Sequence, residues 1–366
     1  MLGKGRPMPL DAIRIAPKPS VFEGRVIWIA VAVGLMLAGC AKAPKPPPPA
    51  PPPPAVQPLV NLSPRVVEMA SAYRAYVVRA SAIDPAFVDG DGVGGALRAS
   101  SAYEPDQMVR GAIAYAAVVA LQDKAFVDSV RAYARDPGQR REVVAELLKN
   151  PAYAQGLNGS ASAAGLIIAN LGGDAQRLYD VGKAVKQSAY DIQRADWSKA
   201  SVADREGRLA AAKAASQAAM LGEVAESARL QQASLARPSA AVSVVPVEGP
   251  YTVTVNRGLT IAALAVLGEA GDAQIEPLMD VMREARIGGC LNSAKLNLYQ
   301  CLAVARPHYE DVFCLGQHAM MDTGRCMIRS AGLAEPYEAR FIPDASSINK
   351  GMGKKLPTRK PVRKKS

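Results

Sequence analysis

The 366-residue sequence has few aromatic residues, since Phe, Trp and Tyr together make up only 5% of the chain. Hydrophobic residues nevertheless reach 49%, and alanine is prominent among them. A core with few large rings and many small side chains argues against a β-sandwich and favours closely packed helices. We therefore predict an all-α, alanine-rich multi-helix fold, in a chain long enough for one large or two ordinary domains.

Recognisable catalytic motifs are also lacking. The sequence contains no GxSxG nucleophile elbow, no HExxH metal-binding helix and no P-loop. His308 and His318 are its only histidines, and a lone histidine on a helix is most simply a packing or surface residue. We therefore assign no catalytic residue, no metal site and no cofactor, and the sequence favours a non-enzymatic protein.

Acidic residues are absent from the C-terminal end. Residues 350–366 contain no Asp or Glu and eight cations, which are Lys350, Lys354, Lys355, Arg359, Lys360, Arg363, Lys364 and Lys365. Residues 1–40 carry a further +3, so the formal charge of +11 resides at the two ends and residues 41–349 are neutral overall. We predict a disordered basic tail over 341–366 that binds an anionic surface in a salt-dependent manner. The alternative is a solubilising tail without a partner.

The apolar run VIWIAVAVGLML at 26–37 has 12 residues, which is too short to span a bilayer and fits the hydrophobic region of a signal peptide. It leads into Leu37-Ala38-Gly39-Cys40, and this junction resembles the lipobox of bacterial lipoprotein precursors. The resemblance implies that residues 1–39 are a signal peptide and that Cys40 becomes the lipid-modified first residue. Ala41, in place of an aspartate, implies an outer-membrane anchor facing the periplasm.

Residues 40–62 are rich in proline, which favours an extended polyproline II conformation without internal hydrogen bonds. At ~3.1 Å per residue, this tether can separate a folded body from the membrane by up to ~70 Å. A proline-rich ligand for an SH3-like domain is the alternative, but such receptors are not expected in a bacterial envelope. We therefore predict a lipid-anchored tether over 40–62.

A helical domain is predicted over 63–240. Ser63 and Pro64 indicate a helix start, because a serine N-cap is commonly followed by proline in the first turn. VDGDGVGG at 88–95 lacks the glutamate of an EF-hand calcium loop and is interpreted as a flexible glycine turn. Proline and glycine punctuation predicts further helices at 105–123, 124–135, 139–149, 160–171, 174–197 and 202–236.

One stretch has a β-like alternation. In AVSVVPVEGPYTVTV, at 241–255, Tyr251, Val253 and Val255 alternate with threonines, as in a half-buried strand. We therefore predict at most one short β-hairpin, with a linker over 241–256. This linker would separate the first helical domain from a cysteine-containing helical subdomain over 257–340.

Four cysteines, Cys290, Cys301, Cys314 and Cys326, lie within 37 residues of the chain. In an exported protein such a cluster indicates two disulfides. Cys290 and Cys301 share a predicted helix, where a rise of 1.5 Å per residue separates their Cα atoms by about 16 Å. A disulfide requires less than about 7 Å, so pairing of neighbours along the chain is excluded.

An antiparallel helical hairpin ranks the remaining pairings. The pairs Cys301–Cys314 and Cys290–Cys326 are both centred on Pro307-His308, where proline favours a helix start. We predict that these two bridges are nested and staple a C-terminal helical hairpin. A zinc site or a thiol–imidazole pair involving Cys314, His318 and Cys326 is the alternative.

These features together predict a lipoprotein of the cell envelope with a structural or scaffold and binding role. Its partners would be the membrane, through the lipid anchor, and peptidoglycan or another anionic envelope polymer, or envelope proteins. Export argues against a nucleic-acid partner for the tail. Two alternatives remain open: a cell-wall hydrolase with an unrecognised site, and a subunit of an envelope assembly, which needs an exposed apolar face at 208–236.

Overall fold

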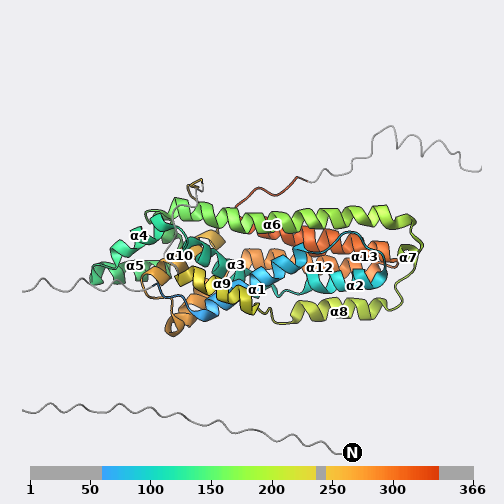
Figure 1. The fold of residues 1–366 in the computed structure, drawn as a ribbon, viewed down its shortest axis with the longest axis horizontal. Helices are drawn as coiled ribbons and strands as arrows, with labels where there is room; N and C mark the ends of the chain where they lie inside the picture. Colours follow the sequence, from blue (N-terminus) through green and yellow to red (C-terminus); the bar gives the residue numbers. More distant parts are fainter. Residues whose placement is uncertain (1–59, 236–244, 338–366) are drawn as a thin grey trace, which may run out of the picture. The chain divides into compact units, whose positions relative to one another are not determined.

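The computed structural model of the chain describes residues 60–235 and 245–337. Within these ranges the chain forms helices, with two isolated β-bridges and no strand, so the predicted all-α class is confirmed (Figure 1). A π-helical segment, Leu315–Asp322, joins the last two helices. The α-helices are α1 (Pro64–Ser81), α2 (Gly90–Ser101), α3 (Pro105–Ala120), α4 (Lys124–Tyr133), α5 (Pro137–Lys149), α6 (Ser160–Asp191), α7 (Asp196–Lys199), α8 (Arg205–Gln217), α9 (Val224–Leu235), α10 (Val253–Val266), α11 (Ile275–Val281), α12 (Ala285–Val304), α13 (His308–Cys314) and α14 (Thr323–Ala331).

The core is built around α3, which is buried along most of its length and packs against both α1 and α10. The helices approach each other closely at small residues. A Cβ atom at Gly258 would lie 2.5 Å from the Cβ of Ala116, and one at Gly111 would lie 2.7 Å from the carbonyl oxygen of Met69. Small side chains at such crossings explain how a chain with few aromatic residues forms a dense core.

Helix α6 runs without a break from Ser160 to Asp191, whereas the sequence predicts two helices separated at Gly172-Gly173. A Cβ atom at Gly172 would lie 2.3 Å from the Cδ1 of Leu333, and one at Gly182 would lie 2.7 Å from the Cβ of Met320. These glycines are contact points for the C-terminal segment. Tertiary packing therefore outweighs their low helix propensity.

Two other stretches are helical where the sequence predicts a turn or a strand. The Oδ1 of Asp89 accepts the N–H of Gly92 at 2.8 Å, and α2 begins at Gly90 in place of the predicted flexible turn. The Oγ1 of Thr252 accepts the N–H of Val255 at 3.3 Å, and α10 begins at Val253. The predicted strand at 251–255 is therefore wrong, because a side-chain cap starts a helix there.

The alanine-rich stretch 202–236 forms two helices, α8 and α9, where one is predicted. In the connection between them, the N–H of Gly222 donates to the Oε1 of Glu68 at 3.1 Å, which holds this segment against α1. Helix α9 is also held there by Arg74, whose Nε lies 3.6 Å from the Oε1 of Glu226. These polar contacts to another helix favour a bend over a continuous helix.

The segments on either side of the predicted 241–256 linker share one hydrophobic core. Helix α10 packs against α3, and α14 packs against α6. The helices of 63–240 and 257–340 therefore form one packed body and do not separate into two. The expected boundary rested on the strand-like alternation, and those residues instead start a buried helix.

The C-terminal helical hairpin carries both predicted disulfides. Cys290 of α12 is bonded to Cys326 of α14, with 5.8 Å between their Cα atoms. Cys301 of α12 is bonded to Cys314 of α13, with a Cα distance of 5.7 Å. Pro307 is the N-cap of α13, at the turn between the two arms. The nested pairing is confirmed.

Candidate functional site

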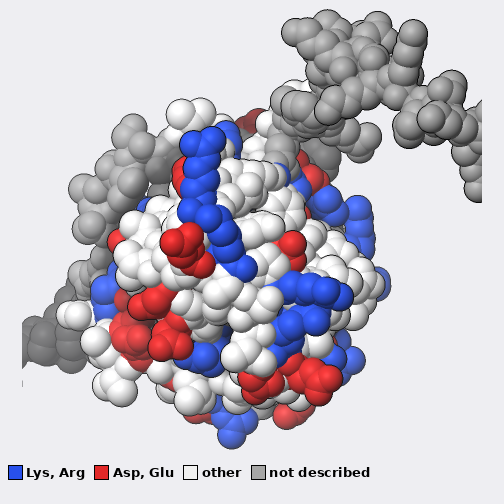
Figure 2. All heavy atoms as spheres, turned by 90° about the vertical axis from the view of Figure 1, so that its right-hand side faces the viewer, with Lys and Arg blue, Asp and Glu red and all other residues white. Residues whose placement is uncertain are grey.

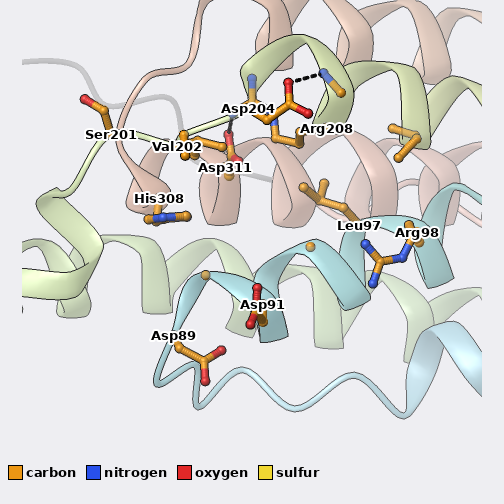
Figure 3. A pocket seen from close by; sticks show the side chains of 16 residues that line it. Asp89, Asp91, Leu97, Arg98, Ser201, Val202, Asp204, Arg208, His308 and Asp311 are labelled. Carbon is orange, nitrogen blue, oxygen red and sulfur yellow. Dashed lines mark hydrogen bonds and ion pairs between the residues drawn. The ribbon is translucent and has the colours of Figure 1, made fainter.

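A groove of about 600 Å³ opens between α2, α8 and the start of α13. The loop at 201–204 closes one side of it, as Figure 3 shows. The groove lies toward the end of the helical body that carries α7 and α13 (Figure 1). Figure 2 looks onto this end, where basic and acidic side chains are interspersed. We call this feature the α2–α8 groove.

One face of α2 lines the groove through Asp91, Gly94 and Arg98. Spacings of three and four residues place these positions on the same side of the helix. Asp91 and Arg98 are exposed, and neither side chain has a hydrogen bond or an ion pair to another described residue. Gly94 has no side chain, which leaves space between the two charged groups.

Three of the four aspartates in the groove also hold the fold together. Asp89 caps α2, and the Oδ1 of Asp204 caps α8 by accepting the N–H of Gly207 at 2.7 Å. Asp311 forms an ion pair with Arg208. Each N-cap leaves one carboxylate oxygen without a partner among the described residues, so these caps can also contact a ligand.

His308 lies against the start of α2 in the groove. A Cβ atom at Gly90 would come within 2.3 Å of the Cε1 of His308, so glycine is required for the ring to lie there. The ring of His308 is also 6.1 Å from the ring of Trp197, measured between centroids. Glycine at the first position of α2 therefore admits an imidazole to the groove.

The ion pair between Arg208 and Asp311 forms the inner wall. The Nη1 of Arg208 donates to the Oδ1 of Asp311 at 2.5 Å, and its Nη2 donates to the carbonyl oxygen of Leu302. The two side chains are 8% and 2% exposed. Burial raises the pKa of Asp311, while the Arg208 guanidinium acts in the opposite direction. The pair fixes α8 to the disulfide-linked hairpin.

Lys295 of α12 joins the C-terminal ends of α2 and α8, and it is only 6% exposed. Its Nζ donates to the carbonyl oxygens of Ser101, at 3.2 Å, and Ser216, at 3.4 Å. The Nζ also lies 4.0 Å from the centroid of the Tyr103 ring. Helix C-termini and aromatic faces both attract a cation. Burial nevertheless lowers the pKa of Lys295 to about 7, with Glu104 opposing the shift.

We expect Lys295 to raise the free energy of unfolding by about 2 kcal/mol between pH 7 and pH 9. In this window the unfolded chain retains the proton, since the ordinary lysine pKa is 10.5, whereas the folded protein loses it. The unfolded state therefore binds more protons, and stability rises with pH. Above pH 10 the trend should reverse, because burial raises the pKa values of Tyr73, Tyr76 and Tyr103 in the folded state.

Urea unfolding curves measured from pH 6 to pH 11 test this expectation. Lys295→Met should flatten the rise between pH 7 and pH 9. Lys213→Met is a matched control, because exposed Lys213 also lies over a tyrosine ring, 5.7 Å from the centroid of Tyr299. An unchanged rise in Lys295→Met would contradict the assignment.

Of the other site residues predicted from the sequence, the four disulfide cysteines are described, and none of them lines the groove. Cys40 and the eight tail cations from Lys350 to Lys365 lie outside the described residues. The Nδ1 of His318 lies 2.8 Å from the Oδ2 of Asp322. The alternative zinc or thiol–imidazole site is wrong, because Cys314 and Cys326 are both in disulfides. No group of three or more His, Cys, Asp or Glu side chains in the described ranges is arranged to hold a metal ion.

Sequence reasoning missed the groove because its residues come from three distant segments. The one available signal was VDGDGVGG, which supplies Asp89, Gly90, Asp91 and Gly94. Because this stretch was interpreted as a turn, Asp91 and Arg98 were not recognised as residues on one face of a helix. The residues opposite, Asp204 and His308, carry no motif of their own.

No family model, curated protein or solved structure matches the chain. Among the helices within 60–235 and 245–337, none combines the length and the hydropathy that crossing a bilayer requires.

Proposed function

We propose that the chain is an exported lipoprotein, anchored to the outer membrane through Cys40, that acts in the cell envelope as a non-enzymatic scaffold and binding protein. The observation that carries the proposal is the pair of nested bridges, Cys290–Cys326 and Cys301–Cys314. Disulfides persist in oxidising compartments such as the periplasm and are rare in the cytosol. The lipobox resemblance at Cys40 supports the same compartment from a separate part of the sequence.

The position of the first described residues supports a role in presenting a surface. The N–H of Asn61 donates to the carbonyl oxygen of Ala265 at 3.0 Å. The nearby carbonyl oxygen of Leu267 accepts from the Nε of Arg140, on α5, at 2.9 Å. Figure 1 shows α5 at the end of the helical body opposite α7 and α13. Residues 60–62 therefore lie away from the α2–α8 groove and leave it open as a binding surface.

The carboxylates of the groove favour binding over hydrolysis. A glycosidase needs two carboxylates that are free to act as acid and as base or nucleophile. In the groove, Asp89 and Asp204 cap helices and Asp311 is paired with Arg208. This leaves Asp91 as the one aspartate lining the groove with no structural contact among the described residues.

The alternative of an assembly subunit depends on an exposed apolar face at 208–236. Leu221, Val224 and Leu235 are exposed there, but Leu230 is buried and α9 packs on α1. In the proposal, the partners are an anionic envelope polymer such as peptidoglycan, contacted by the cations from Lys350 to Lys365, and envelope proteins. Nucleic acid is not among them.

In a bacterial host supplied with labelled palmitate, we expect the full chain to incorporate the label and Cys40→Ala to lose it completely. The variant should also leave the outer-membrane fraction, because the acylated terminus provides the membrane anchor. Cys290→Ala/Cys326→Ala removes two other cysteines, which are bonded to each other, and should remain labelled. Label that persists in Cys40→Ala, or an outer-membrane location without it, would contradict the proposal.

A further inference from the structure

We propose that the α2–α8 groove binds a short peptide that carries ammonium groups toward one end and a free carboxylate at the other. The inference rests on the proposed function for its compartment and deepens it by naming the ligand class of the groove. The juxtaposition that carries it is a set of carboxylates facing one end of the groove and the unpaired Arg98 at the other.

Charges in the groove are separated along its length. Helices α2 and α8 run side by side in the same direction, because the Oγ of Ser216, near the end of α8, donates to the carbonyl oxygen of Ser101, at the end of α2. Their N-caps, Asp89 and Asp204, therefore lie toward the same end of the groove. Figure 3 shows Asp91 on the same side and Arg98 farther along α2.

The lining is complementary to a ligand that is cationic overall. The Arg208–Asp311 pair is internally neutral, so the remaining ionised groups are three aspartates and Arg98. Ligand ammonium groups would face the aspartates, and a ligand carboxylate would form charge-assisted hydrogen bonds with Arg98. Arg98 and Asp91 have no partner among the described residues with which a ligand would compete.

A buried donor beside the groove also lacks an acceptor. The Arg208 side chain is 8% exposed, and its Nε has no hydrogen-bond partner in the described part of the chain. A buried N–H without an acceptor is unfavourable, whereas the other two Arg208 nitrogens are satisfied by Asp311 and Leu302. A ligand oxygen that binds next to Arg208 would accept a hydrogen bond from this Nε.

The spacing of the charged groups sets the length of the ligand. Asp91 and Arg98 are seven residues apart on one helix, which places their Cα atoms about 10 Å apart. The Arg98 guanidinium turns back to 3.5 Å from the position of a Cβ atom at Gly94, so the charged groups are closer together than the Cα atoms. An extended peptide spans about 3.3–3.6 Å per residue, so three residues are enough to bridge the two groups. The groove volume of about 600 Å³ is in the range of small-ligand sites.

Titration calorimetry of the purified full chain, with its disulfides intact, tests the proposal with the tripeptide Lys-Ala-Ala. The peptide with free termini should bind, and acetyl-Ala-Ala-Ala-amide should not. Asp91→Asn and Arg98→Gln should each weaken binding by about fivefold. Added salt should weaken it further, because the contacts are between exposed charges.

Two glycines provide a matched pair of blocking variants. Gly94 lines the groove, and Gly95 does not. A Cβ atom at either position meets only the Arg98 guanidinium, at 3.5 Å and 3.9 Å respectively, so both substitutions should preserve the fold, which circular dichroism can verify. Gly94→Leu fills the groove and should abolish binding, whereas Gly95→Leu can only displace the Arg98 guanidinium and should weaken binding no more than Arg98→Gln does.

Failure of Lys-Ala-Ala to bind the unmodified chain would overturn the inference, as would equal binding of the blocked peptide. Binding that Gly94→Leu and Gly95→Leu affect equally would also overturn it. Calorimetry on purified protein does not depend on acylation of Cys40. A negative titration therefore leaves the lipoprotein proposal standing, and loss of that proposal in the palmitate experiment leaves the groove assignment standing.

Discussion

Removal of the outer bridge in Cys290→Ala/Cys326→Ala is expected to lower the free energy of unfolding by about 4 kcal/mol. The bridge closes a loop with a sequence separation of 36, so its loss restores considerable conformational freedom to the unfolded chain. Cys326 is also buried against the core, and alanine leaves a small gap there. Equilibrium unfolding in urea at pH 7, without reductant, measures the change.

The inner bridge provides the comparison. Cys301→Ala/Cys314→Ala opens a loop with a sequence separation of 13 and should cost about 3 kcal/mol, less than the outer pair. Reductant should destabilise the unmodified protein by more than either double variant and should have no effect on a variant that lacks all four cysteines. A loss below 1 kcal/mol for the outer pair, or a larger loss for the inner pair, would contradict the entropic account.

Loss of the buried ion pair on the groove wall should have an effect of similar size. Arg208→Leu is expected to lower the free energy of unfolding by about 3 kcal/mol at pH 7. Asp311 is then left 2% exposed and without its counter-ion. Burial already raises the pKa of Asp311, and the substitution should raise it further. The loss should therefore be smaller at pH 4, where the carboxyl is protonated, than at pH 7.

Two further variants separate the charge effect from lost packing. Arg208→Leu/Asp311→Leu removes both charges and should recover most of the stability, because an apolar pair can replace a buried ion pair. Arg205→Leu removes a neighbouring arginine that donates to the carbonyl oxygens of Ala303 and Ala305, both at 2.8 Å, and that pairs with no carboxylate of the described residues. It should cost about 1 kcal/mol. Equal losses for Arg205→Leu and Arg208→Leu would show that the buried charge is unimportant.

The disulfide pairing could be predicted from the sequence because it depends on local geometry. The rise of a helix separates Cys290 from Cys301, and a turn at Pro307 aligns the remaining cysteines of the two arms. The start of α1 was predictable for the same reason, since Ser63 and Pro64 act within one turn of each other. In both cases, the structure is determined by interactions between residues that are close in the sequence.

The glycine-rich positions show where local reasoning fails. Gly172 and Gly182 lie within one continuous helix because the C-terminal segment packs against them. Gly90 begins α2 and makes room for His308, which is more than 200 residues away in the sequence. The sequence does not distinguish a glycine that ends a helix from one that lets another segment pack closely against the helix. Only the neighbour distinguishes the two cases, and it comes from elsewhere in the chain.

The sequence by itself determined the helical class, the nested bridges and the segregation of charge to the two ends, since each follows from composition or from spacing along the chain. Only the tertiary structure determined which residues line the α2–α8 groove and which contacts hold its helices together. Arg98, Asp204 and His308 lie on three separate segments, and they line one cavity because α12 and the hairpin hold α2 and α8 together. Lys295 is one lysine among many in the sequence, and it caps two helices because long-range packing brings their C-termini to it.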